Sequence, residues 1–368
     1  MSTRKDKFSK KDKKYMSLAL SLASTRHGHT GENPSVGCVI VKNDKIISIG
    51  QTGYNGRPHA EYNAIKNSIE ILEGSTMYVT LEPCNHYGQT PPCTKEIIRN
   101  KISKVIYSVE DIDKKVKGKS FKILMLKNII VKKNLLGKEI NNFYKPYFFN
   151  RRNKIPYVTG KIAVSKNNLI YSKGTKRITN IHSDKLTHFL RYKNDSLMIT
   201  YKTLNKDNPR LDCRLEGLNK FSPKRIILDN NLKMNTSSYI FRTVNKSNTI
   251  VFYKKAGKTK ISMFKKRGIK LIRSNLLKNG NFDIKLIFKK LYSLGCRNLL
   301  VESGNDLSKS IIKNKLFNQF YLYKSPKNLS KLVAYKEFNC FKILSQKYKS
   351  KNKINTKLGK DSITLYKK

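Results

Sequence analysis

Residues 58–93 contain Pro58-His59-Ala60-Glu61, then Leu81-Glu82-Pro83-Cys84, then eight residues and Cys93, and they set what the rest of the chain must build. One histidine and two cysteines can bind a Zn²⁺ ion and leave its fourth coordination position open. An open position is typical of catalytic zinc, whereas a structural zinc has four protein ligands. Under the structural alternative, His86 would be the fourth ligand. We expect a catalytic zinc ion bound by His59, Cys84 and Cys93.

Glu61 is the candidate acid/base of this site. It lies two residues after His59, so on a helix its side chain would point elsewhere than at the metal. A carboxylate beside zinc-activated water is placed to take a proton and pass it on. The pattern His-x-Glu followed by Pro-Cys and a second Cys is typical of zinc nucleobase deaminases, in which the glutamate is not a ligand.

Length and charge limit the function classes. A chain of 368 residues is long enough for two domains, and its 38% hydrophobic content in recurrent runs indicates a folded protein. The net charge of +53 suggests nucleic-acid or membrane binding. However, the basic residues are spread along the chain and cluster only in residues 1–14 and near 344–353. We therefore favour compositional bias, and expect a phosphorylated small-molecule substrate and no nucleic-acid or membrane partner.

The amino terminus and the cysteines indicate a cytoplasmic protein. Residues 1–15 are rich in lysine without a following apolar segment, and no run approaches the ~18 apolar residues of a membrane span. In a reducing compartment cysteines bind metal or pack in the core. We expect packing roles for Cys38, Cys213, Cys296 and Cys340. A homo-oligomer is compatible with the sequence.

Hydrophobic periodicity predicts alternating helices and strands in the first half. The predicted helices cover 11–26, 59 to about 70, a start at 83–84, 93–100 and 121–127, and the predicted strands cover 36–41, 46–49, 76–81, 105–109 and 129–131. This alternation favours a layered α/β domain, which we place at residues 1–150. Asn33, just before the first strand, either caps a loop or hydrogen-bonds a base.

The second half also alternates, which predicts a second α/β domain over residues 151–368. The boundary falls in the polar, aromatic and basic segment 141–153. Strands are expected to begin at 155 and to cover 196–200, 225–229, 249–253, 269–273 and 298–301, with helices at 182–192, 261–266 and 284–294. The tail beyond residue 335 carries no prediction.

Three segments, 33–41, 56–61 and 80–93, closely resemble the bifunctional deaminase/reductase family of riboflavin biosynthesis. Its eight-residue cysteine spacer differs from the two-residue spacer of cytidine, tRNA-adenosine and single-stranded-DNA deaminases. The resemblance implies a cytidine-deaminase-like α/β/α layer domain that binds zinc through His59, Cys84 and Cys93. It also implies hydrolytic deamination of 2,5-diamino-6-(5-phosphoribosylamino)pyrimidin-4(3H)-one, with Glu61 as the proton shuttle.

Segments 190–191, 203–214, 225–229 and 301–307 are similar to the reductase half of the same family, which has a dihydrofolate-reductase-like α/β fold. The resemblance implies NADPH-dependent reduction of the ribosyl group to ribityl. The implied NADPH-binding residues are Ala163, Arg177, Thr203, Asp207, Asn230, Gly304, Asn305, Asp306, Leu307, Ser308, Lys309 and Ser310. The implied substrate-binding residues are Thr175, Arg191, Leu211, Arg214 and Glu302.

Elementary chemistry supports parts of this assignment. Arg191 and Arg214 suit a ribose phosphate because a guanidinium grips phosphate through two donors, and Gly304 before a helix start suits a pyrophosphate. The chain departs from the family at 166–169, where Lys-Asn-Asn-Leu replaces Leu-Asp-Gly-Arg, and at 303–305, where Ser-Gly-Asn replaces Gly-Gly-Pro. The first alternative is therefore an active deaminase with a weakened or lost reductase. A nucleic-acid deaminase or basic RNA-binding module is the second, against which the spacer and the reductase half both argue.

Overall fold

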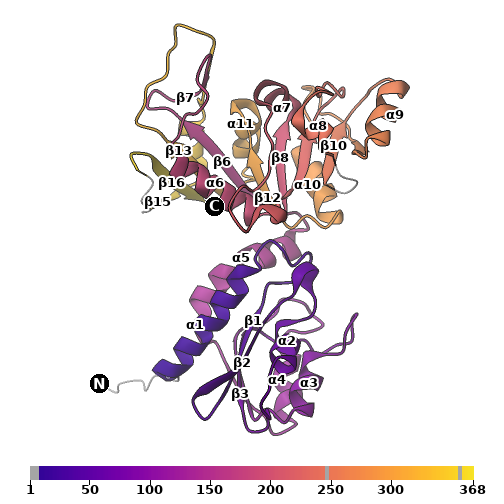
Figure 1. The fold of residues 1–368 in the computed structure, drawn as a ribbon, viewed down its shortest axis with the longest axis vertical. Coiled ribbons are helices and arrows are strands. Elements are labelled where there is room, and N and C mark those ends of the chain that lie inside the picture. Colours follow the sequence, from indigo (N-terminus) through magenta and orange to yellow (C-terminus); the bar gives the residue numbers. More distant parts are fainter. Residues whose placement is uncertain (1–7, 245–247, 355–358) are drawn as a thin grey trace. The chain divides into compact units, whose positions relative to one another are not determined.

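The computed structural model describes residues 8–244, 248–354 and 359–368 and divides into two compact units, 1–153 and 154–368 (Figure 1). Each unit has its own apolar core. The predicted boundary at 150 lies inside α5 (Gly137–Asn153), three residues before the first unit ends. Within the described ranges, no helix has both the length and the apolar content needed to cross a bilayer.

The first unit is built on a five-stranded sheet of order β2-β1-β3-β4-β5. β1 is antiparallel to β2 and β3, while β3, β4 and β5 are parallel. Helices α1 and α5 cover one face, and α2, α3 and α4 cover the other (Figure 1). The bounds are α1 (Lys10–Thr25), β1 (Gly37–Lys42), β2 (Lys45–Gln51), α2 (Ala60–Lys66), β3 (Thr76–Leu81), α3 (Cys93–Arg99), β4 (Lys104–Val109), α4 (Lys119–Met125) and β5 (Ile130–Lys133).

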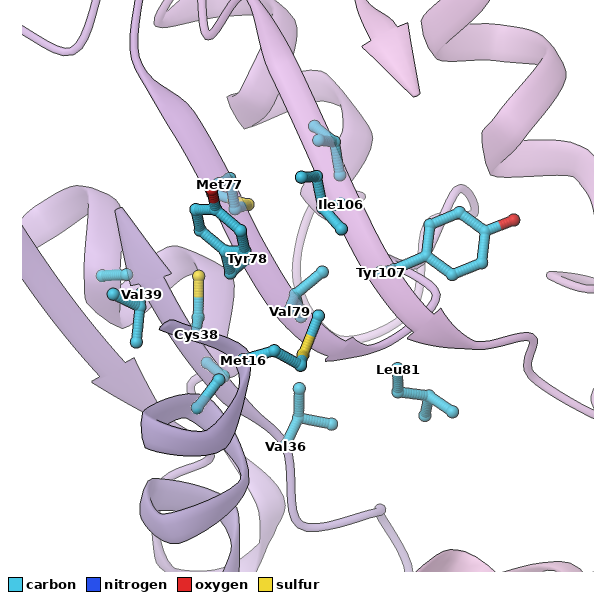
Figure 2. Packing of buried hydrophobic residues seen from close by; sticks show 14 of the residues in the cluster. Met16, Val36, Cys38, Val39, Met77, Tyr78, Val79, Leu81, Ile106 and Tyr107 are labelled. Carbon is cyan, nitrogen blue, oxygen red and sulfur yellow. The ribbon is translucent and has the colours of Figure 1, made fainter. Parts of the chain in front are cut away.

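Side-chain chemistry explains the packing of α1. Ser9 and Asp12 form a capping box that satisfies the free N–H groups at its start. Met16 then projects among side chains of β1, β3 and β4 (Figure 2). At Gly37 a Cβ atom would come within 1.9 Å of the Ala19 carbonyl oxygen. Only glycine therefore lets α1 lie this close to β1.

Two predictions for the first unit differ from the structure, and one segment for which no helix was predicted is helical. The helix predicted to reach residue 70 ends at Lys66. Pro83-Cys84 does not open a helix: it lies in the loop between β3 and α3. The boundary segment 141–153 is helical in α5, because Ile140, Tyr144 and Phe148 repeat every four residues and are buried on one stripe despite Pro146. The Tyr144 hydroxyl also donates to the Ser35 carbonyl oxygen (3.0 Å) and thereby ties α5 to the loop before β1.

The second unit contains a nine-stranded sheet of order β11-β10-β9-β8-β12-β6-β13-β16-β15. The strands from β11 to β13 are parallel, and β13, β16 and β15 are antiparallel. Neighbouring residues of β9, Ile226 and Ile227, belong to different apolar clusters, so the sheet is buried on both faces. The strand bounds are β6 (Tyr157–Val164), β8 (Ser196–Thr200), β9 (Lys224–Leu228), β10 (Thr249–Tyr253), β11 (Lys270–Arg273), β12 (Asn298–Glu302), β13 (Gln319–Lys324), β15 (Ser350–Lys353) and β16 (Ser362–Lys367).

A separate two-stranded sheet joins β7 (Leu169–Ser172) and β14 (Tyr335–Glu337). The helices are α6 (Ile181–Tyr192), α7 (Tyr201–Asp207), α8 (Tyr239–Arg242), α9 (Lys258–Lys266), α10 (Ile284–Ser293), α11 (Asn305–Lys313) and α12 (Phe341–Lys347). The tail beyond 335, for which the sequence carried no prediction, therefore supplies β14, α12 and the antiparallel edge of the large sheet.

Candidate active sites

A histidine and two cysteines meet in the first unit. His59 is the N-cap of α2, Cys84 lies in the loop after β3, and Cys93 is the first residue of α3. The His59 Nδ1 atom lies 3.5 Å from Cys84 Sγ and 3.4 Å from Cys93 Sγ, and all three ligand atoms lie within 4.8 Å of one another. A tetrahedral zinc ion with bonds of ~2.0 Å to nitrogen and ~2.3 Å to sulfur spaces such atoms about 3.5 Å apart. The three side chains therefore fit one zinc ion.

Among the described residues, this cluster has three members and no fourth protein ligand. His86 lies outside it, although it lines the same cavity. The structural-zinc alternative, with His86 as a ligand, is therefore not supported. The cluster leaves a coordination position for a reacting molecule, as a catalytic site requires.

Glu61 lies beside the cluster in the first turn of α2 and is buried, with 4% of its surface exposed. Burial raises the pKa of Glu61 to about 7, so its carboxyl can exchange a proton near neutral pH. The hydrogen bond between the two thiols lowers the pKa of Cys84 and raises that of Cys93. A bound zinc ion would hold both cysteines as thiolates.

A cavity of about 130 Å³ opens beside this cluster. Asn33 lines it, and its amide nitrogen donates to the Gly56 carbonyl oxygen (3.0 Å), which agrees with the loop-capping interpretation. Glu82, which the sequence analysis did not single out, also lines the cavity. Its carboxylate accepts hydrogen bonds from the backbone N–H groups of Asp111 (3.4 Å), Gly118 (3.0 Å) and Ser120 (3.3 Å). The sequence feature that could have identified Glu82 is its position as a charged residue directly before Pro83-Cys84.

A larger cavity, of about 850 Å³, lies in the second unit. The carboxyl end of β12 and the N-terminus of α11, with Gly304 as its N-cap, border it. A helix N-terminus offers free N–H groups and a positive dipole end to a phosphate. The predicted residues that line this cavity are Ala163, Thr203, Asp207, Asn230, Glu302, Gly304, Asn305, Asp306, Leu307 and Ser310.

The remaining predicted residues of the second unit lie outside that cavity lining. Arg177 pairs with Asp184 at 3.0 Å and is exposed. Arg191, for which a phosphate contact is predicted, donates from Nε and Nη2 to Glu302 (2.7 and 2.9 Å). Burial favours protonation of Glu302, but the opposing charge of Arg191 holds its pKa at about 2. The others outside the lining are Thr175, Leu211, Arg214, Ser308 and Lys309.

Comparisons with known proteins place both units in one family. Residues 9–109 match the cytidine and deoxycytidylate deaminase zinc-binding region, and residues 156–333 match the RibD C-terminal domain. The riboflavin biosynthesis protein RibD of Aquifex aeolicus strain VF5 is 33% identical over 359 residues, which cover 97% of this chain and 98% of that protein. This chain belongs to the RibD family. RibD of Actinobacillus pleuropneumoniae is 32% identical over 86% of this chain and 84% of its own length.

Solved structures of RibD proteins agree over the whole chain. Acinetobacter baumannii RibD superposes with a TM-score of 0.83 at 25% identity, covering 97% of this chain and 99% of that one. The Thermotoga maritima diaminohydroxyphosphoribosylaminopyrimidine deaminase/5-amino-6-(5-phosphoribosylamino)uracil reductase gives 0.81 at 26% identity, with 97% and 98% covered. The predicted pair of folds, cytidine-deaminase-like and then dihydrofolate-reductase-like, is confirmed.

Several basic side chains without a predicted role line the larger cavity. Lys161 on β6 lines the larger cavity and pairs in register with Glu302 of β12. Burial lowers the pKa of Lys161. Lys202, Lys206, Lys233 and Lys336 line the same cavity. Such a set suits a dinucleotide, which carries several phosphate charges.

Proposed function

We propose that this chain performs two steps of riboflavin biosynthesis, a zinc-dependent deamination followed by an NADPH-dependent reduction. His59, Cys84 and Cys93 would hold the zinc ion, and Glu61 would move the proton. The observation that carries the proposal is the three-ligand cluster, which has an open position and a buried carboxyl at its side. Relatives named RibD that cover nearly the full length of the chain support it.

The proposed substrate is 2,5-diamino-6-(5-phosphoribosylamino)pyrimidin-4(3H)-one. Its deamination yields 5-amino-6-(5-phosphoribosylamino)uracil, whose ribosyl group is then reduced to ribityl. The name of the Thermotoga maritima protein states both activities, and that protein is similar over 97% of this chain. A cytoplasmic location fits a chain in which all six cysteines are free. A homo-oligomer would also be consistent with the family.

In the first step, zinc when bound supplies a nucleophilic water at neutral pH. Glu61, with its pKa of about 7, takes up a proton from the attacking water. The same carboxyl passes this proton to the ring nitrogen and then moves the second proton of that water to the amino group, which departs as ammonia. Asn33 and Glu82 hold the cavity walls in place through their hydrogen bonds to backbone groups.

In the second step, NADPH supplies the hydride and the chain positions both molecules. The N-terminus of α11 would bind the pyrophosphate of the cofactor. The proposed NADPH contacts also include Ala163, Arg177, Thr203, Asp207, Asn230 and the residues from Gly304 to Ser310. Thr175, Arg191, Leu211, Arg214 and Glu302 are proposed to face the substrate, with Arg191 acting through its ion pair with Glu302.

The test is to incubate the pure protein with the phosphoribosylamino pyrimidine, with and without NADPH, and to identify the products by mass. We expect the deaminated product without NADPH and the ribityl product with it. Glu61→Gln should retain zinc and lose deamination, because the amide cannot carry the proton. Normal turnover by this variant would remove Glu61 from the mechanism.

The sequence alternatives are not favoured. A deaminase with a lost reductase would leave NADPH unoxidised in the same assay when the deaminated intermediate is supplied. A nucleic-acid-binding protein would show a steep salt dependence in a gel-shift series, because phosphate contacts release counterions. The RibD C-terminal domain over residues 156–333 speaks against both.

A further inference from the structure

The small volume of the zinc cavity raises the question of where a substrate phosphate binds. Pockets that enclose a whole ligand of drug-like size measure ~300–1,000 Å³, whereas this cavity measures about 130 Å³. A pyrimidine ring beside the metal therefore leaves the phosphoribosyl group to extend toward the cavity opening. Two half-buried arginines, Arg57 and Arg151, belong to the lining.

We propose that Arg57 and Arg151 form a phosphate subsite of the deaminase and select a phosphorylated pyrimidine nucleotide as its substrate. This inference rests on the proposed deaminase function and adds to it the groups that recognise the phosphate. Within the described residues, neither guanidinium forms an ion pair with a carboxylate. Both positive charges are thus available to an anion.

Arg57 is held against the loop between the two cysteine ligands. Its Nη1 atom donates to Thr90 Oγ1 at 2.7 Å, a neutral partner that leaves the charge uncompensated. The backbone of that loop passes close to Arg57, since a Cβ atom at Gly88 would lie 3.5 Å from its Nη2 atom. Gly88 and Thr90 line the same cavity. The guanidinium is therefore held in place at the cavity lining by a neutral partner.

Arg151 comes from the last turn of α5 and reaches the same cavity. Its Nη2 atom donates to the Glu32 carbonyl oxygen at 2.6 Å, and its guanidinium lies 5.4 Å from the centre of the Tyr147 ring. Its Nε–H is buried and has no acceptor among the described residues. A buried donor without a partner is unfavourable, and a phosphate oxygen would satisfy it.

The two arginines flank one loop. Arg151 bonds to Glu32, whereas Asn33, the next residue, bonds to the carbonyl oxygen of Gly56, which directly precedes Arg57. Residues 32–33 therefore link the two arginines through one hydrogen bond to Arg151 and one to the backbone next to Arg57. This arrangement brings two cations from distant parts of the sequence to one cavity.

Carboxylates also line this cavity, and each already has a hydrogen-bond donor or the metal cluster as its neighbour. The substrate phosphate is therefore expected at the arginines and not at the carboxylates. Asp111 accepts hydrogen bonds from the Tyr147 hydroxyl (3.3 Å) and the Asp113 N–H (3.0 Å), and Asp113 accepts one from the Lys115 N–H (3.0 Å). Glu82 is bound by three backbone N–H groups, and Glu61 lies at the metal cluster. A phosphate would therefore bind to the arginines, and the ribose hydroxyls could meet the aspartates.

The experiment compares ammonia release from the phosphorylated aminopyrimidine and from its dephosphorylated form, in wild type, Arg57→Gln and Arg151→Gln. Losing one charge-assisted hydrogen bond lowers kcat/KM for the phosphorylated compound by roughly 10–100-fold. We expect this loss to appear mainly in KM, while kcat/KM for the dephosphorylated compound stays unchanged. Arg151→Lys should recover part of the preference because it keeps the charge.

Arg152→Gln is the matched control. Arg152 is the next residue of α5, is exposed, and lies over the Phe148 ring outside the cavity lining. This variant should behave as wild type toward both compounds. Zinc content and NADPH oxidation measured on every variant report whether the two units are folded.

Two results would overturn the subsite. An equal loss for both compounds would show that the arginines only support the fold, and no loss in either variant would show that they do not bind the phosphate. A wild-type protein that deaminates neither compound would instead refute the proposed function itself. These outcomes are separate, because the first two require an active wild-type enzyme.

Discussion

At the scale of single residues, Asp195 joins two neighbouring strands of the second unit. It precedes β8, and its Oδ2 atom accepts the backbone N–H groups of Arg297 and Asn298 (2.8 and 2.7 Å) at the start of β12. Burial raises the pKa of Asp195 from 3.8 to about 6. The folded chain therefore holds this proton more tightly than the unfolded chain does.

This pKa shift predicts a pH-dependent stability. The unfolding free energy should fall as pH rises from about 4 to about 6, because the folded state must ionise a buried carboxyl. The full contribution is about 3 kcal/mol, from ~1.4 kcal/mol per pKa unit. Asp195→Asn should remove this decline, as measured by the urea midpoint of the second unit at pH 4.5 and pH 7. If the difference between variant and wild type is the same at both pH values, Asp195 does not titrate in this range.

Residues also show what a sequence can and cannot predict. His59, Cys84 and Cys93 could be predicted because metal ligands have a characteristic spacing at the ends of consecutive elements. The pairing of Arg191 with Glu302 could not be predicted, because it joins a helix to a distant strand through tertiary packing alone. Arg57 and Arg151 were missed for the same reason: their common cavity exists only in the folded chain.

Among the elements of the first unit, Glu82 links the end of β3 to the segment that runs from the end of β4 into the start of α4. Its carboxylate binds three backbone N–H groups of residues 111–120, and this segment forms one wall of the zinc cavity. An amide at this position offers a single acceptor and introduces a donor that faces other N–H groups. The wall should therefore loosen without loss of the metal ligands.

We expect Glu82→Gln to raise KM for deamination by about 10-fold or more, in line with ~1–3 kcal/mol for a lost charged hydrogen bond, with a smaller change in kcat. Amide hydrogen exchange at Gly118 and Ser120 should become faster. Glu110→Gln is the control, because Glu110 pairs with the half-exposed Lys133 and is not itself part of the cavity lining. Unchanged exchange at both amides would show that Glu82 does not hold this segment.

Elements were predictable where one local signal acted alone. β3 was predicted with its observed bounds, and the hairpin turn at Asn43-Asp44 adopts the positive φ values that these residues tolerate. Helix α5 was not predicted, because Pro146 and its polar residues obscured a buried stripe that only tertiary packing makes visible. Pro83-Cys84 was also mispredicted from local sequence. Pro83 is a helix-start signal, but these residues form a loop that places Cys84 in the metal cluster.

At the scale of the whole molecule, the two activities depend on separate sets of residues. The zinc cluster belongs to the unit 1–153, and all residues lining the larger cavity fall between 161 and 337 in the unit 154–368. Each unit has its own apolar core. Nothing in the chemistry of the second step requires the first unit's metal, since NADPH carries the hydride.

Removal of zinc should therefore separate the two steps. After treatment with a chelator, we expect ammonia release from the diaminopyrimidine to stop, while NADPH oxidation with the deaminated intermediate continues at its original rate. With a reductant present throughout to keep Cys84 and Cys93 as thiols, added Zn²⁺ should restore deamination. Parallel loss of both activities at the same chelator concentration would mean that zinc supports the fold of the entire chain, because a metal acting only as a catalyst cannot affect a site in another unit.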